Sequence, residues 1–406
     1  MRIAYLTPEF VTEPYFSGGL ANYVNRLGLA LARDGHDIHV LVRAAQDGDP
    51  FDHHGATVHR VAPMRPVRYF DVLDLGKVPD TAAWLGFSRA VSRRVKALNA
   101  EAPFDLVQAS NSRGCGLFTA LRTSLPVLTR ISCFRPLWNR VCRIPRGRDE
   151  VATEWVELLQ MRISRGVFAP SKALARVIEH NAHIPRVPVV PTPMYLETPN
   201  EDDTAYREHC EGMEYILYVG RYQEHKGFHI LAQAMSKILD SQPNLGAVFV
   251  GADAPGMGRP SMAGWARETL APYADRLRFI GQTPHSRLYP IIRRAKLVVL
   301  PSLVDNLPNT CLEAMALGRP VLGTRGASFE ELIDHGVNGF LTLPNDPGQL
   351  ARAMAQALSH PNLETVGRAA RASMDRLAPE NTLAAHLALY REILAAHPPT
   401  NHSPAE

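Results

Sequence analysis

The stretch 297–324 constrains the fold more than any other part of this chain. It begins with the apolar run 297–300, which ends at a proline and is typical of a strand buried in a parallel sheet. A polar loop follows, and from Asn309 apolar residues recur at helical spacing up to Gly318, the type of residue that follows a helix end. A further apolar run, 320–322, predicts the next strand. This order of strand, helix and strand predicts an open α/β sheet with parallel strands.

Two carboxylates flank the start of the predicted helix. Asp305 lies in the loop, and Glu313 follows eight residues later, where we expect the first helical turn. Ligands of open parallel sheets bind beyond the carboxyl ends of the strands, and the amides of a helix start favour an anion there. A phosphate could lie on these amides while Glu313 accepts hydrogen bonds from neutral hydroxyls. The alternative is a solvated Asp305 and a Glu313 that only complements the helix dipole.

A second crossover unit in the C-terminal half places two cations at a strand end. The strand 215–219 leads into Gly220 and Arg221, and Lys226 precedes a helix. Arginine can pair with a diphosphate through two hydrogen bonds, and lysine can act as a point charge. Further strands are expected at 247–250 and 277–280. The alternative is that both cations are solvated surface charges.

The N-terminal half alternates short β-branched runs with helical segments, which also predicts a parallel sheet flanked by helices. The expected strands are 2–6, 37–42, 57–61, 106–108, 127–131 and 167–169. The loop after the first strand ends in Gly18 and Gly19, immediately before an amphipathic helix. Paired glycines let backbone amides approach a bound group closely, although the same pair also occurs in simple turns.

Composition limits the class of protein. A chain of 406 residues with 46% hydrophobic and 21% charged residues is globular and long enough for two domains. The formal charge of +4 does not suggest a nucleic-acid partner. The five cysteines are odd in number and lack close pairs, which favours a reducing, cytoplasmic setting. No membrane span or signal peptide is expected from the sequence.

Other polar groups were considered for metal or anion binding. Asp47 and Asp49 lie among glycine and proline in a predicted surface turn, and the three histidines His53, His54 and His59 lack a metal-ligand spacing, so no metal site is predicted. The segment 130–148 carries six arginines interleaved with Phe, Leu and Trp. It suits a phosphate-bearing acceptor or peripheral contact with an anionic membrane face, or it is a solvated surface.

The acid pair and its surroundings resemble the donor-binding signature of retaining family 4 glycosyltransferases with the GT-B fold, in which the first acid is usually Glu rather than Asp. The resemblance implies two Rossmann-like α/β domains whose parallel sheets face each other across a cleft. It implies that a nucleotide-sugar donor is the co-substrate, with no other cofactor and no metal. The residues at donor-binding positions are Gly18, Gly19, Arg221, Lys226, Gln282, Asp305, Asn306, Leu307, Pro308, Asn309, Thr310 and Glu313. Of these, Asp305, Arg221 and Lys226 are expected to take part in catalysis.

A proline cluster near Pro193 and the polar stretch after it indicate the end of a first domain and a linker, and the resemblance implies the place of the last helix. We expect an acceptor domain at 1–195, a linker at 196–213 and a donor domain at 214–379, with a last helix at about 380–397 packed back on the first domain and a disordered tail at 398–406.

One position departs from the family pattern. Many relatives place a donor-contacting histidine after the fifth strand of the first domain, where this chain has Ser132. Ser132 and Arg135 are therefore candidates for acceptor binding only.

The expected function is metal-independent, retaining transfer of a sugar from a UDP- or GDP-sugar to a small-molecule, glycan or lipid-linked hydroxyl. Two alternatives stay open, a nucleotide-sugar-binding protein without transferase activity and a nucleotide-sugar epimerase. The expected location is the cytoplasm, with possible contact at the inner membrane face.

Overall fold

The computed structural model describes residues 1–14, 19–64, 77–194, 196 and 202–396. The chain forms two compact units, which are described separately. Unit 1 comprises Met1–Pro193 and Pro379–Glu406, and unit 2 comprises Met194–Ala378. The tail 398–406 and Gly18, for which the sequence makes predictions, lie outside the described residues.

Unit 1 is built on a seven-stranded sheet in the order β3-β4-β2-β1-β5-β6-β7. All neighbouring strands are parallel except β3 and β4, which form an antiparallel pair. The strands are β1 (Arg2–Thr7), β2 (Asp37–Arg43), β3 (Phe51–His53), β4 (Ala56–Val61), β5 (Leu106–Ser110), β6 (Val127–Arg130) and β7 (Gly166–Phe168). The strands expected from the sequence are present with slightly shifted ends, and β3 was not foreseen.

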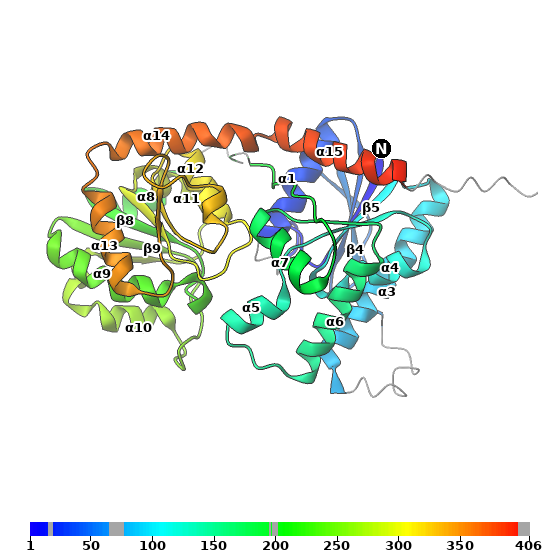
Figure 1. The fold of residues 1–406 in the computed structure, drawn as a ribbon, viewed down its shortest axis with the longest axis horizontal. Coiled ribbons are helices and arrows are strands. Elements are labelled where there is room, and N and C mark those ends of the chain that lie inside the picture. The colour runs from blue at the N-terminus through cyan, green and yellow to red at the C-terminus, as the bar shows by residue number, and fades with distance from the viewer. Residues whose placement is uncertain (15–18, 65–76, 195, 197–201, 397–406) are drawn as a thin grey trace, which may run out of the picture. The chain divides into compact units, whose positions relative to one another are not determined.

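Helices cover both faces of this sheet (Figure 1). They are α1 (Gly19–Arg33), α3 (Pro79–Glu101), α4 (Leu117–Arg122), α5 (Arg135–Val141), α6 (Arg148–Ile163), α7 (Lys172–Ala182) and α15 (Pro379–Ala396). Alternate residues of β1 show how the strands serve two faces. Tyr5 packs with residues of α1 and α15, whereas Leu6 packs with residues of α3. Burial on both faces explains why the strands are continuous apolar runs.

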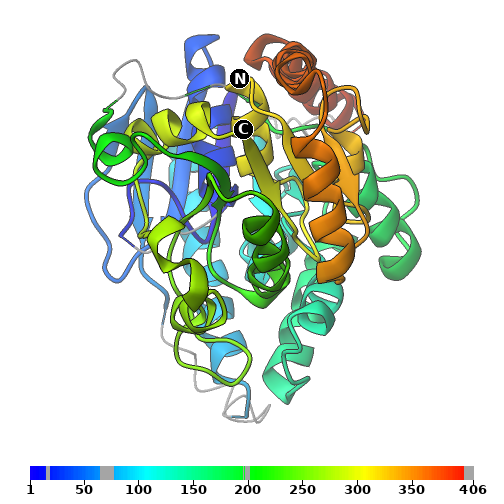
Figure 2. The same ribbon diagram turned by 90° about the vertical axis from the view of Figure 1, so that its left-hand side faces the viewer.

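Unit 2 contains a six-stranded sheet, entirely parallel, in the order β10-β9-β8-β11-β12-β13. Its strands are β8 (Glu214–Val219), β9 (Leu245–Val250), β10 (Leu277–Ile280), β11 (Leu297–Leu300), β12 (Val321–Thr324) and β13 (Phe340–Thr342). Its helices are α8 (Thr204–His209), α9 (Phe228–Ser241), α10 (Met262–Thr269), α11 (His285–Arg294), α12 (Asn309–Ala316), α13 (Pro347–Leu358) and α14 (Leu363–Ser373). Helices α9 and α13 lie side by side on one face of the sheet (Figure 1, Figure 2).

The segment that the sequence assigns to a linker contains helix α8, which packs against α11. Two ion pairs fasten its start: Asp202 to Arg287 at 2.6 Å and Asp203 to Arg294 at 3.1 Å. The described part of this segment is therefore an element of unit 2.

A chain of buried hydrogen bonds connects α15 to the sheet of unit 1. Tyr5 and Tyr390 hydroxyls lie 2.9 Å apart, and Tyr390 donates to Gln108 Oε1 at 2.6 Å. Gln108 Nε2 donates to the Tyr23 hydroxyl, which lies 3.0 Å from His386 Nε2, and His386 Nδ1 lies 2.8 Å from the Thr382 carbonyl. The carbonyl can only accept, so Nδ1 carries a proton, and in the neutral imidazole Nε2 then accepts from the Tyr23 hydroxyl. Burial lowers the pKa of His386 to about 4.

Because His386 is buried in its neutral form, we expect unit 1 to lose stability in mild acid. The unfolded chain binds a proton near pH 6.5 and the folded chain only near pH 4, so the unfolded state holds more protons between these values and stability falls as pH falls. Between pH 7 and pH 5 the loss from this residue is about 2 kcal/mol. In His386→Gln, which cannot titrate, urea unfolding at both pH values should show that much less pH dependence; an unchanged dependence would contradict the assignment.

Candidate active site

The candidate site lies where the strand order of unit 2 changes direction. The chain runs from β8 to β9 on one side of β8, while β11 lies on its other side. The loops after β8 and β11 therefore leave the same edge in opposite directions. In open α/β sheets, such a reversal of strand order is the place of the ligand-binding crevice. These two loops contain Arg221, Lys226 and Asp305, the residues that the sequence singled out.

The backbones of the two loops approach each other closely at Gly227. This glycine has φ +68°, and a Cβ atom there would lie 1.9 Å from the Pro301 carbonyl oxygen. The Leu303 amide also donates to the His225 carbonyl at 2.8 Å. Only glycine combines this backbone conformation with such an approach. The contact fixes the position of Lys226 relative to the loop that follows β11.

Lys226 and Asp305 form an ion pair between the two loops. Their Nζ and Oδ2 atoms are 2.7 Å apart, and the side chains are 29% and 12% exposed. The structure thus brings together two residues that are 79 positions apart in the sequence. Partial burial reduces solvent screening of the pair, so its charges act on a ligand more strongly than surface charges would.

Further hydrogen bonds hold the loop after β11 in place. Asp305 Oδ1 accepts from the Asn306 amide at 3.0 Å, and the Asp305 carbonyl accepts from Ser328 Oγ, in the loop after β12, at 3.1 Å. Helix α12 then begins at Asn309. The amides of Asn309 and Thr310 belong to its first turn, which has no preceding helical carbonyl to bind, so they are suited to an anion.

Glu313 does not occupy the first turn of its helix, as the sequence suggested. It is the fifth residue of α12, and its side chain is only 4% exposed. Its Oε1 lies 3.6 Å from Nε2 of His285, the first residue of α11. A buried carboxylate in the second turn cannot be explained as a solvated partner of the helix dipole. His285 was missed in the sequence, although its place after β10 on the same sheet edge was a usable signal.

Arg221 and Gln282 lie on the same edge but are more exposed. Arg221 follows β8 directly, and its carbonyl accepts from the Tyr218 hydroxyl at 2.7 Å. Gln282 follows β10, which is two strands from β8. Gln282 therefore lies farther along the edge than the Lys226–Asp305 pair. Its expected contact with the base of the nucleotide stays a prediction.

His225 adds no charge to the site at neutral pH. Burial and the neighbouring Lys226 lower the pKa of its imidazole to about 4. In the loops after β8 and β11, the positive charges are therefore those of Lys226 and Arg221.

In unit 1, the structure shows the contacts of both residues that the sequence connects with acceptor binding, Arg135 and Ser132. Arg135, in α5, donates to Glu157 Oε1 from Nη2 at 2.7 Å and from Nε at 3.0 Å. Its guanidinium thus forms an internal ion pair, and the Glu157 carboxylate raises the pKa of Arg135 against the effect of burial. A role of Arg135 in acceptor binding stays a prediction. Ser132 lies 2.9 Å from the Ser110 hydroxyl at the carboxyl edge of the sheet. Gly19 is the exposed first residue of α1.

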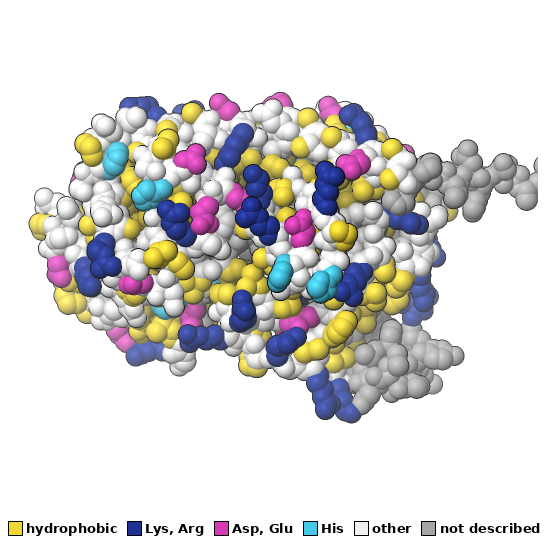
Figure 3. Space-filling model, in the orientation of Figure 1, with side chains coloured by type: hydrophobic (Ala, Val, Ile, Leu, Met, Phe, Trp, Pro, Cys, Tyr) yellow, Lys and Arg dark blue, Asp and Glu magenta, His cyan; other side chains and the backbone are white. Residues whose placement is uncertain are grey.

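The basic segment 130–148 is not a uniformly solvated or membrane-facing surface. Arg130 and Arg135 point into unit 1, and Arg146 pairs with Glu154 at 2.6 Å. A membrane contact would depend on the exposed Arg140, Arg143 and Arg148, and it stays a prediction. On the face shown in Figure 3, Lys and Arg side chains are interspersed with Asp and Glu.

The other groups considered for metal binding have structural contacts. The Asp47 carboxylate accepts from the Ala62 amide at 2.8 Å. His59, expected to be solvated, is buried, and its Nε2 lies 2.9 Å from His39 Nδ1. Within the described residues, no three His, Cys, Asp or Glu side chains are grouped to hold a metal ion. None of the five cysteines forms a disulfide bond, and no helix in the described ranges has the length and apolar character to cross a bilayer.

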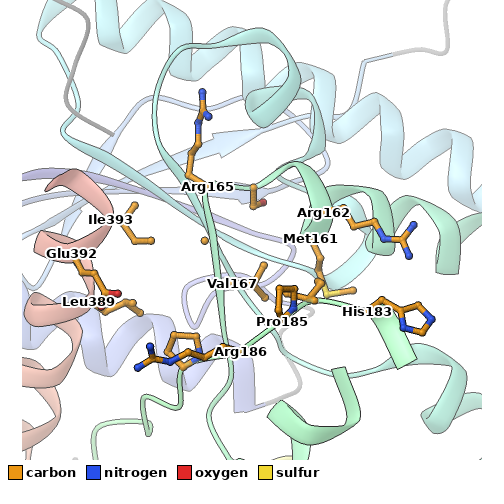
Figure 4. Close-up of a pocket in the computed structure, with 14 residues that line it drawn as sticks. Met161, Arg162, Arg165, Val167, His183, Pro185, Arg186, Leu389, Glu392 and Ile393 are labelled. Carbon is orange, nitrogen blue, oxygen red and sulfur yellow. The ribbon is translucent and has the colours of Figure 1, made fainter. Parts of the chain in front are cut away.

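A pocket in unit 1 lies at the opposite edge of the sheet, where β7 begins. It has a volume of about 390 Å³ and is lined by the ends of α6 and α7 and by α15. Its cationic side chains do not converge, because Arg162, Arg165 and Arg186 extend in different directions (Figure 4). This arrangement does not define a binding site for one anion.

Two open sheets of Rossmann type, one in each unit, define the GT-B class of glycosyltransferases. The family models agree with the fold: glycosyltransferase family 4 matches residues 17–197, and glycosyl transferases group 1 matches residues 201–373. The chain belongs to glycosyltransferase family 4, and it is a glycosyltransferase.

Similar proteins cover nearly the whole chain. D-inositol 3-phosphate glycosyltransferase from Acidothermus cellulolyticus is 25% identical over 93% of this chain and 86% of its own length. Sucrose-phosphate synthase from Thermosynechococcus elongatus superposes with a TM-score of 0.80 at 22% identity, covering 97% and 99% of the two chains. Anabaena HepE, solved with UDP and glucose, has a TM-score of 0.70 at 18% identity, covering 97% and 100%.

Proposed function

We propose that this glycosyltransferase transfers a sugar, with retention of configuration and without a metal ion, from a UDP- or GDP-sugar to a hydroxyl acceptor. The observation behind this proposal is the Lys226–Asp305 pair at 2.7 Å, which lies at the strand-order reversal of unit 2. The buried Glu313 lies in α12, the helix that follows the loop of Asp305. These groups match the parts of a nucleotide sugar, which has a diphosphate between two polyhydroxylated rings.

Each part of the donor has a suitable partner. The diphosphate fits the cations Lys226 and Arg221 together with the first amides of α12, and the Asp305 carboxylate suits hydroxyls of the sugar. Glu313 is placed to accept hydrogen bonds from ribose hydroxyls, since a buried carboxylate requires donors. His285, 3.6 Å from Glu313, helps to orient that carboxylate.

In the proposed reaction, the bond between the anomeric carbon and the diphosphate oxygen breaks while the acceptor oxygen bonds to the same face of that carbon. The acceptor proton passes to the departing phosphate, so no protein base is required. Negative charge grows on the diphosphate, and Lys226, Arg221 and the helix amides stabilise it in the transition state. Ser132 takes the place at which many relatives have histidine, and no catalytic histidine is assigned there.

The comparisons support a UDP-sugar as the first donor to test, because Anabaena HepE was solved in complex with UDP and glucose and in complex with UDP-glucose. The names of two similar proteins include a phosphorylated product or acceptor. A cytoplasmic location is part of the same proposal, because none of the five cysteines forms a disulfide bond and a reducing environment keeps thiols in that state.

The test is release of nucleoside diphosphate from UDP- and GDP-sugars in the presence of a cell extract as the source of acceptors. Wild-type protein should release it in an acceptor-dependent manner. Glu313→Ala should weaken donor affinity by at least about tenfold, because a buried hydrogen-bonding partner of the donor is lost. Binding without release would favour the non-catalytic binding protein, and conversion of the donor sugar without acceptor would favour the epimerase. Wild-type affinity in Glu313→Ala would remove that residue from the site.

A further inference from the structure

Arg130 is a buried cation without a carboxylate partner among the described residues. It is the last residue of β6, and only 6% of it is exposed. The ion pairs of the described ranges, which extend to 4.0 Å, do not include it, although they include the neighbouring Arg135 and Arg146. Transfer of an uncompensated guanidinium from water into a protein interior is costly, so buried charges are normally paired.

The hydrogen-bond partners of this guanidinium are neutral hydroxyl groups, which include that of Tyr23. Nη1 donates to Ser132 Oγ and Nη2 to Thr192 Oγ1, both at 3.4 Å, and the buried Nε has no partner among the described residues. The guanidinium carbon lies 3.8 Å from the ring centre of Tyr23. A cation–π contact contributes about 2 kcal/mol when desolvated, which does not match the cost of burying the charge.

The surroundings of Arg130 are hydroxyl groups at the ligand-binding edge of the sheet. Arg130 is paired in register with Ser110, the last residue of β5, and the Ser110 and Ser132 hydroxyls lie 2.9 Å apart. Ser132 is only partly buried, so it lies where the cluster meets solvent. The guanidinium has N–H donors that are not used in hydrogen bonds, and it lies next to the hydroxyls of Ser110, Ser132 and Thr192. Such an arrangement suits a tetrahedral oxyanion.

We propose that Arg130, with Ser132 and Thr192, binds a phosphate group at the carboxyl edge of the unit 1 sheet. The guanidinium supplies a charge-assisted pair of hydrogen bonds, and the two hydroxyls, which now occupy its Nη atoms at 3.4 Å, turn to the phosphate oxygens. The phosphate comes from a phosphorylated acceptor of the proposed transferase reaction or from free inorganic phosphate. The first source extends the proposed function and depends on it; the anion site itself does not.

The experiment is a thermal-shift titration of the full chain with inorganic phosphate, at an ionic strength held constant with sodium chloride. Wild-type protein should show a saturable rise in melting temperature. Lys226→Ala, which removes one of the two cations of the donor crevice, should keep this rise. Arg130→Met, a side chain of similar length without charge, should raise the apparent dissociation constant at least about tenfold. If Arg130→Met does not fold, Arg130→Lys, which keeps the charge but not the planar fork, should weaken binding partially.

Two outcomes would overturn the proposal: no saturable phosphate shift in wild-type protein, or the same shift in Arg130→Met. A parallel titration with glucose 6-phosphate and glucose separates the two sources. Tighter binding of the sugar phosphate than of inorganic phosphate, with no effect of glucose, indicates a phosphorylated acceptor, and equal binding indicates free phosphate. The titration measures binding and needs no turnover, so its result can be interpreted even if the transferase proposal fails. Conversely, transfer to an unphosphorylated acceptor would support the transferase proposal even if Arg130 does not bind phosphate.

Discussion

Lys226→Ala is expected to lower kcat/KM for the nucleotide-sugar donor by about 10²–10³-fold, equivalent to about 3–4 kcal/mol of transition-state stabilisation. The leaving diphosphate gains negative charge as the glycosidic bond breaks, and Lys226 is the more buried of the two cations at the crevice. Its removal also leaves the Asp305 carboxylate without the ammonium group that lies 2.7 Å away. We expect kcat to fall by a larger factor than the donor dissociation constant rises. The reason is that the diphosphate carries more negative charge in the transition state than in the bound donor.

A matched control is present on the other edge of the same two strands. Lys296 precedes β11 and pairs at 2.9 Å with Glu214, the first residue of β8, so it has the same type of ion pair on neighbouring strands at the edge away from the crevice. Lys296→Ala should keep wild-type kcat/KM and cost at most about 1 kcal/mol of stability, as expected for an exposed pair. Steady-state kinetics of both variants with the same donor decides the matter, and an equal effect of the two substitutions would refute the role of Lys226.

The sequence was informative wherever periodicity and a strand end coincide. Apolar runs of four to six residues predicted the central strands of both sheets, and cations or acids directly after them identified the loops of Lys226 and Asp305. The pairing itself could not be read from the sequence, because only the strand order shows that β8 and β11 are neighbours. The strands β3 and β13 were missed, since three residues are too few to show a period.

Charge patterns were the least reliable guide. In the segment 130–148 the arginines look alike, but Arg135 pairs with Glu157, a residue 22 positions away that lies on another helix. Arg130 became buried because β6 ends beneath Tyr23 of α1. Long-range partners determine which charges face solvent, and a linear run of cations does not show them. Glu313 illustrates a related limit. Helix α12 begins at Asn309, as expected, but Glu313 is its fifth residue and lies in a buried second turn rather than the expected first turn.

Gly227→Ala is expected to lower the free energy of unfolding of unit 2 by about 3–5 kcal/mol, which combines the strain of a left-handed backbone with an alanine side chain and the cost of overpacking. The added Cβ would meet the Pro301 carbonyl oxygen at 1.9 Å, a backbone atom that cannot rotate away. The loops after β8 and β11 would have to separate, so Lys226 and Asp305 would move apart and donor affinity should fall with stability.

Gly258 provides the control for backbone strain alone. It has a similar φ of +71°, but no atom lies within 4 Å of a Cβ placed on it. Gly258→Ala should therefore cost only about 1–2 kcal/mol, the penalty of the left-handed conformation. Hydrogen exchange of the β8 and β11 amides measures local stability in both variants, and donor titration measures binding. Since the two substitutions share the conformational term, their difference isolates the contact between the loops. A difference near zero would mean that the Gly227 backbone can move away from Pro301 at little cost, and that the crevice is not fixed by this contact.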